Sequence, residues 1–224
     1  LISVDAPALR STNGTVRLYD LPALTNLEMS SLETVRGDFI VERVALPTLE
    51  GLRALRDVDG RFSVAKNPEL RDSGGLSALM SVGDTLGFAQ CPNLQELEGF
   101  QGFEEHPNLL AIADMENLRL IEGVRGVRTL GALELARLPS LAPGQGFLSL
   151  TSLQNLLLER IEPSWEFGEL EIVAPLSSVF VARTSFSNLA GMELARDADV
   201  TLAFNENLAD LRGVNTPRFL GRVT

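Results

Sequence analysis

A short motif, Pro-x-Leu or Asn-Leu, recurs along almost the whole chain at nearly constant spacing. Its last residue serves as an anchor for alignment, and the nine anchor positions are Leu24, Leu49, Leu70, Leu94, Leu118, Leu141, Trp165, Leu189 and Leu208. Successive anchors are 19 to 25 residues apart, with a mean of 23. A fixed period of this length is the sequence signature of a solenoid, in which each repeat packs against its neighbours.

Two apolar columns precede the anchors and indicate what each repeat is made of. All nine residues eight positions before an anchor are apolar: Val16, Val41, Phe62, Leu86, Leu110, Leu133, Leu157, Val181 and Val200. Six of the nine residues six positions before an anchor are apolar as well. Two apolar positions that are two residues apart indicate a short strand with one face directed inward. Because repeats of paired helices need about 34 residues or more, this period predicts one strand per coil, with like residues stacked in an interior row.

The expected fold is a mainly all-β, single-domain solenoid of about nine coils, either a parallel β-helix or a leucine-rich-repeat-like stack. The usual leucine-rich motif has Asn two residues before the next Leu, whereas Asn67 and Asn205 stand three residues before their anchors. This difference favours the β-helix variant. Within a domain of 1–224 we expect a short first coil at 1–13, regular coils over 14–211, and the start of a further strand or a cap at 217–224.

The repeat units resemble those of a known family. The segments 60–70 (GRFSVAKNPEL) and 86–94 (LGFAQCPNL) are similar to units of the receptor L domain, and the resemblance covers roughly residues 14–211. It implies a right-handed, leucine-rich-repeat-like β-helix of the kind found in insulin- and EGF-type receptor ectodomains, fungal cell-wall proteins and bacterial surface proteins. The chain lacks the cysteines of the animal receptors, so the resemblance points to a bacterial surface protein. It also implies an extracellular or cell-surface location, with any signal or anchor outside this segment.

Composition excludes several classes of function. The chain has 19 basic and 30 acidic residues, a net charge of −11, which repels phosphate backbones and anionic lipid, so we expect no nucleic-acid partner. One cysteine, Cys91, and one histidine, His106, exclude a disulfide framework and zinc sites built from several Cys or His ligands. No apolar run reaches 18 residues, so we expect no membrane insertion in this segment. No cofactor, metal site or catalytic residue is expected.

Charged residues interrupt the second apolar column at three coils, at Arg43, Glu159 and Arg183. Since burying an unpaired charge is costly, we interpret them as local register shifts that direct these side chains outward. In the first of these coils, Phe39 and Val41 would then supply the core.

Three residues share a column three positions before the anchor: Asn67, Cys91 and Asn205. We expect the two asparagines to bind backbone groups at a coil corner. Cys91 is expected to be buried as a small apolar residue.

The columns between the inward ones contain a candidate binding face. In the coils from 109 to 182 these outward positions form an apolar run of seven residues: Leu109, Ala111, Ala132, Leu156, Leu158, Phe180 and Ala182. Contiguous apolar surface on a flat sheet commonly marks a partner site. The alternative is that a loop or a flanking segment folds over it.

These features favour a non-catalytic recognition or adhesion module of a bacterial cell-surface or secreted protein. It would bind a protein partner, or another copy of itself, through a flat sheet face. The rivals are a carbohydrate-binding or polysaccharide-active β-helix protein and a purely structural spacer. Glycan cleavage needs paired carboxylates, but the outward columns hold only Glu42, Glu134 and Asp199, on coils far apart. Loop carboxylates such as Asp114 and Glu116 are the remaining place where such a pair would form.

Overall fold

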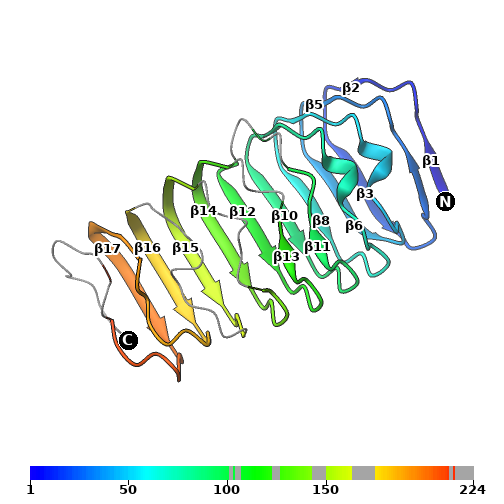
Figure 1. Cartoon of the computed structure of the whole chain (residues 1–224). Helices are drawn as coiled ribbons and strands as arrows, with labels where there is room; N and C mark the ends of the chain where they lie inside the picture. Colours follow the sequence, from blue (N-terminus) through cyan, green and yellow to red (C-terminus); the bar gives the residue numbers. More distant parts are fainter. Residues whose placement is uncertain are drawn as a thin grey trace.

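The computed structural model describes residues 1–100, 103, 107–122, 127–142, 150–162, 175–211 and 214. These residues form a solenoid of about eight turns with a period of about 23 residues (Figure 1). Its main wall, called the main sheet below, has nine parallel strands that follow one another in sequence order: β3 (Val16–Leu21), β6 (Phe39–Val44), β8 (Phe62–Ala65), β10 (Thr85–Ala89), β12 (Leu109–Ala113), β14 (Thr129–Ala136), β15 (Ser152–Glu159), β16 (Leu176–Ala182) and β17 (Leu194–Ala203). The predicted all-β parallel solenoid is therefore confirmed. The expected strand or cap at 217–224, the anchor Trp165 and the lone His106 lie outside the described residues.

Shorter elements form the other walls of the coil. One wall is a four-stranded sheet of β2 (Ser11–Thr12), β5 (Thr34–Val35), β7 (Asp57–Val58) and β9 (Ser81–Val82). Two further pairs are β1 (Ser3–Asp5) with β4 (Asn26–Glu28), and β11 (Glu96–Leu97) with β13 (Leu120–Ile121). Two 3₁₀-helices, η1 (Glu50–Leu52) and η2 (Gly74–Leu76), lie on successive coils near the N-terminal end (Figure 1).

The core consists of stacked rows of inward side chains from the main sheet. The first inner row is Val16, Phe39, Phe62, Leu86, Leu110, Leu133, Leu156, Val179 and Val200. Within it the rings of Phe39 and Phe62 stack at a centroid distance of 5.6 Å and an interplanar angle of 10°. Such an aromatic pair adds about 0.5–1.5 kcal/mol to the stabilisation from burial. The stacking of these two rings therefore favours the observed register between β6 and β8.

The sequence-based inner row is wrong in three coils. Phe39 rather than Val41 pairs with Phe62, while Val41 belongs to the second inner row beside Val64. In β15 and β16, Leu156 and Val179 replace the expected Leu157 and Val181. The reason is the chain length between strand and anchor. The coils of β6 and β16 have two additional residues between strand and anchor, and the coil of β15 has one. Counting back eight positions from the anchor therefore ends two residues, or one residue, after the true inner position.

The chain turns at the end of each main-sheet strand through a residue in the left-handed conformation. These nine non-glycine residues have φ between 52° and 56°, and we call them the corner row: Asp20, Arg43, Lys66, Gln90, Asp114, Arg137, Arg160, Arg183 and Phe204. This conformation costs about 1–2 kcal/mol for a residue with a Cβ, so the packed coils must stabilise it. The interpretation of Arg43, Glu159 and Arg183 as outward is confirmed, since each side chain is at least a quarter exposed.

Two asparagines stabilise the corners at the ends of β6 and β16, the two coils that contain two additional residues each. Asn67 accepts a hydrogen bond from the Val44 N–H at 2.9 Å and donates one to the Val41 carbonyl at 3.0 Å. Asn205 accepts from the Thr184 N–H at 2.9 Å and donates to the Val181 carbonyl at 2.8 Å. The expected corner role of both residues is confirmed.

Cys91 is fully buried, as expected, in the core next to the corner row. Burial raises the pKa of its thiol to about 11. The thiol is therefore protonated at neutral pH.

Candidate recognition face

The outward side of the main sheet is built from two complete rows of side chains. The middle outer row is Arg17, Ile40, Ser63, Gly87, Ala111, Glu134, Leu157, Phe180 and Thr201. The distal outer row, next to the corner row, is Tyr19, Glu42, Ala65, Ala89, Ala113, Ala136, Glu159, Ala182 and Ala203. Because the strands are in register, neighbours in a row are also neighbours in space.

The structure keeps part of the predicted face and corrects the rest. Leu109, Ala111 and Ala132 face outward and are partly exposed, and Phe180 faces outward with 36% of its surface exposed. The other three predicted residues are not accessible: Leu156 is 2% exposed, Leu158 0% and Ala182 1%.

These corrections have two causes. Leu156 and Leu158 belong to the inner rows, because β15 is shifted by one residue relative to the count from its anchor. Leu157, expected in the core, is the leucine of this strand that faces outward. Ala182 does occupy the distal outer row, between Glu159 and Ala203, but it is covered there.

The corrected set of outward apolar residues is called the apolar strip: Leu109, Ala111, Ala132, Leu157 and Phe180. Phe180 pairs directly with Leu157 across β15 and β16. Glu134 separates Leu157 from Ala111 in the middle outer row. The apolar strip is therefore most pronounced at its C-terminal end, where the two large side chains Leu157 and Phe180 are adjacent and accessible.

The centre of the outer face is almost flat. Over β8, β10 and β12 its two rows hold only small side chains: Ser63, Ala65, Gly87, Ala89, Ala111 and Ala113. Small outward side chains leave the pleated backbone open to close approach by another molecule. The face thus has a flat centre between two ends of different chemistry.

Two ion-pair networks border this face along the corner row. In the N-terminal network, Arg43 binds Asp20 through its Nε and Nη2, the second contact at 3.0 Å. Its Nη1 donates to the Glu42 carboxylate at 2.8 Å, and Lys66 Nζ donates to the same Oε1 at 3.0 Å. The side chains are 22–54% exposed, so each pair contributes about 0–1 kcal/mol.

The C-terminal network repeats this design. Arg137 donates to Asp114 from Nε and from Nη2, the latter at 2.9 Å, and to Glu159 from Nη1 at 3.1 Å. Arg183 Nη1 reaches the other Glu159 oxygen at 3.3 Å. The hydrogen bond from Arg137 lowers the pKa of the Asp114 carboxyl, and the same pairing raises the pKa of Arg137.

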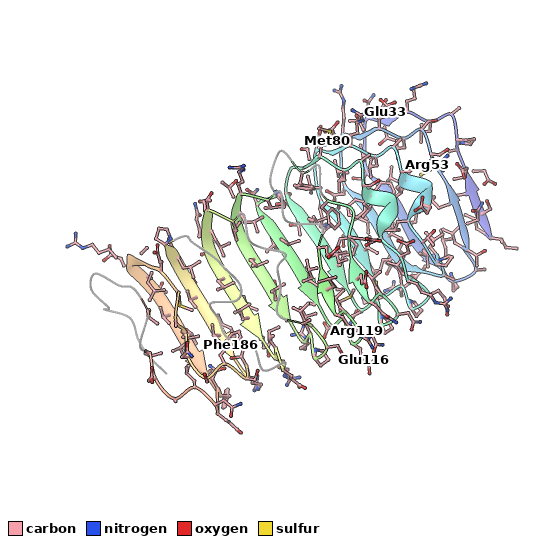
Figure 2. All side chains as sticks on the ribbon, in the orientation of Figure 1. Glu33, Arg53, Met80, Glu116, Arg119 and Phe186 are labelled. Atoms are coloured by element: carbon pink, nitrogen blue, oxygen red, sulfur yellow. The ribbon has the colours of Figure 1, made fainter. Side chains whose placement is uncertain are left out.

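The structure brings several loop carboxylates together beside this network. A hollow of about 310 Å³ is lined by Asp114, Glu116, Arg137, Pro139, Arg160 and Glu162. Glu116 lies at the edge where the main-sheet strands end, whereas Glu33 and Met80 lie at the opposite edge (Figure 2). Glycoside cleavage needs a carboxylic acid with a raised pKa, but Arg137 lowers that of Asp114.

The three carboxylates expected in the outward columns stay apart, as the sequence indicated. Glu42, Glu134 and Asp199 lie on β6, β14 and β17, and no two of these strands are adjacent in the main sheet. Among the described residues no group of three or more His, Cys, Asp or Glu side chains is arranged to hold a metal ion. The same residues contain no helix long and apolar enough to cross a membrane.

Comparisons with models of known protein families, with curated proteins and with solved structures found no match. The resemblance to the receptor L domain therefore depends on the repeat residues of segments 60–70 and 86–94. The parallel solenoid is compatible with that family but does not identify it.

Proposed function

We propose that this protein is a non-catalytic recognition module that binds a protein partner through the outer face of its main sheet. The observation that carries the proposal is the pair Leu157 and Phe180, two large apolar side chains that face outward on adjacent strands. Among the residues that the structure describes, Phe180 is one of six large hydrophobic residues with 36% or more of their surface exposed. Apolar side chains at the centre of a contact, with aromatic residues prominent among them, are typical of protein interfaces.

The flat region on β10 and β12, which β14 and its Glu134 separate from this pair, supports the same proposal. The small side chains there leave room for a partner that contacts Leu157 and Phe180 to extend across the sheet. A second copy of the chain is one partner of this kind. The resemblance of the repeats to receptor L domains supports a place at the cell surface or in the extracellular space of a bacterium.

The double variant Leu157→Asp/Phe180→Asp tests the proposal. Because both side chains face outward, the variant should unfold at the same temperature as the wild type within a few degrees. We expect its association constant to fall at least tenfold, since a carboxylate buried without a partner costs about 1–3 kcal/mol or more. Light scattering measures self-association directly, and Ser152→Asp, at the exposed start of β15, is the control.

Two results would contradict the proposal. One is a self-associating wild type whose mass the double variant leaves unchanged. If the wild type is monomeric, a random-peptide display selection replaces the mass measurement. Selected peptides that bind the double variant as well as they bind the wild type would then contradict it.

A further inference from the structure

The N-terminal end of the outer face contains a hollow with a different chemistry. Ile40 occupies the middle outer row, yet only 7% of its surface is exposed. The side chains that line the hollow around it are Arg17, Tyr19, Glu42, Arg61 and Ser63, which come from β3, β6 and the start of β8. Its volume is about 330 Å³. Ile40 is thus the apolar floor of an open site.

The hollow carries an uncompensated positive charge. Glu42, its one lining carboxylate, already accepts hydrogen bonds from Arg43 and Lys66 at 2.8 and 3.0 Å. Arg61 has a distant ion pair, 3.8 Å between its Nη2 and Asp38 Oδ2. Arg17 has no ion pair or side-chain hydrogen bond with any described residue. A guanidinium without a partner is a ready donor for a carboxylate, which it binds through two parallel hydrogen bonds.

The remaining walls are suited to a polar ring. The hydroxyl groups of Tyr19 and Ser63 form no hydrogen bond within the described part of the chain, so both can bind ligand hydroxyls. Tyr19 is 44% exposed, and the Arg43 guanidinium carbon lies 4.2 Å from the centroid of its ring. Together with Ile40 it offers apolar contact to the carbon face of a ring.

We propose that this hollow binds an acidic sugar residue of a glycan, such as a uronic acid. The carboxylate pairs with Arg17, the ring lies over Ile40 against Tyr19, and Ser63 binds a ring hydroxyl. The volume is near the lower limit of about 300 Å³ for small-molecule sites, which suits one sugar ring. An aspartate or glutamate of a protein would satisfy Arg17 but leave the two hydroxyl groups and most of the hollow unfilled. Nucleic acids, with a charge at every phosphate, are disfavoured because the chain as a whole carries −11 charges.

The site is independent of the protein interface proposed above. The hollow lies over β3, β6 and β8, whereas Leu157 and Phe180 lie on β15 and β16, at the other end of the face. The variant Leu157→Asp/Phe180→Asp should therefore bind sugar as the wild type does. A failure of sugar binding contradicts only the sugar site, and a failure of protein association contradicts only the proposed protein interface.

Calorimetry with defined sugars tests the inference. The probes are trimers of galacturonic acid and of glucuronic acid, a sialic acid dimer, and the fully methyl-esterified galacturonic acid trimer as the uncharged match. We expect at least one acidic probe to bind, and the methyl-esterified trimer to bind at least tenfold more weakly than that probe. Arg17→Gln should lower the affinity roughly tenfold or more, as expected when a charge-assisted pair is lost. Tyr19→Ala should weaken binding without any change in charge.

The control variant is Arg10→Gln, which removes an exposed arginine that pairs with Glu33 away from the hollow. It should bind the acidic probe with wild-type affinity. The proposal is overturned if no acidic probe binds, if the ester binds equally well, or if the two arginine variants behave alike. Equal or tighter binding of hexaglutamate would also overturn it, because the ligand would then be an acidic protein segment. Thermal unfolding of each variant shows whether it is folded. The variant Tyr19→Ala adds a test that keeps Arg17 and Arg61, the two arginines of the hollow.

Discussion

The two ends of the outer face differ greatly, although the inner rows beneath them are alike. Over β3, β6 and the start of β8 most outward residues are charged or carry a hydroxyl group, and they surround a hollow with Ile40 as its apolar floor. Over β15 and β16 the middle outer row presents Leu157 and Phe180 instead. The inner rows are aliphatic or phenylalanine at both ends, because each inward side chain must pack against its counterparts in the coils above and below. Outer positions lack this constraint, so chemical differences between coils concentrate there.

The comparison also explains why recognition suits this architecture. Each coil adds two outward side chains to a rigid lattice, and neither contributes much to the core. One end of the face can therefore differ from the other without any change of fold. A module of this kind has room for two ligands of unlike chemistry on a single sheet.

The sharpest test of the difference between inner and outer rows is a pair of adjacent leucines. Leu156→Ala should lower the free energy of unfolding by about 2–5 kcal/mol, because Leu156 is 2% exposed and its removal leaves a cavity. Leu157→Ala should change it by less than about 1 kcal/mol, since Leu157 faces outward. Denaturant unfolding measures both values. Equal losses at the two positions would refute the register of β15.

The same leucines show where sequence reasoning fails. The period, the parallel strands and the outward charges at Arg43 and Glu159 were predictable, because they follow from alternation and from the cost of burying charge. The run Leu156-Leu157-Leu158 has no alternation of its own, so only the distant anchor indicates which of these leucines face inward. Glu159 indicates the correct phase of this strand. Alternate residues of a strand share a face, so an outward Glu159 carboxylate requires an outward Leu157.

The corner row offers a more regular reference than the anchors, but it is invisible in the sequence. Its members recur 21 to 24 residues apart, yet they include Asp, Arg, Lys, Gln and Phe. The left-handed conformation arises from the packing of coils and not from a residue preference. The hollow near Ile40 was missed for a related reason. Arg17 and Arg61 are 44 residues apart in the sequence, and their convergence depends on coils that are two steps apart in the stack.

The two corner asparagines test whether the ends of the solenoid are equally ordered. Asn67→Ala should cost about 2–4 kcal/mol, because Asn67 is 1% exposed and its loss leaves the Val44 N–H and the Val41 carbonyl unpaired. Asn205→Ala should cost roughly half as much, since Asn205 is only partly buried and water can replace its amide. Thermal unfolding gives both values. A larger loss at Asn205 would show that the C-terminal corner is the more critical of the two.

The smallest expected effect concerns pH and the C-terminal ion network. Arg137 lowers the pKa of Asp114 below the ordinary value of an aspartate, so the folded state favours the ionised carboxylate. The stability from this pairing is fully present above the pKa of the unfolded chain, and it is lost as pH falls through the folded pKa. Arg137→Gln should therefore destabilise the protein by about 0–1 kcal/mol at neutral pH, because the pair is partly exposed.

The difference between Arg137→Gln and the wild type should begin to shrink as the pH falls below about 4, where an aspartate of the unfolded chain becomes protonated. It should disappear only below the lowered pKa of Asp114 in the folded wild type. Unfolding curves at pH 7 and pH 3 measure it, with Arg71→Gln as the control for an exposed pair whose carboxylate, Glu69, lies outside this network. A destabilisation that is the same at both pH values would mean that Arg137 acts through packing of its carbon chain and not through the charge of Asp114. That outcome would assign Arg137 a structural role at the C-terminal border of the outer face.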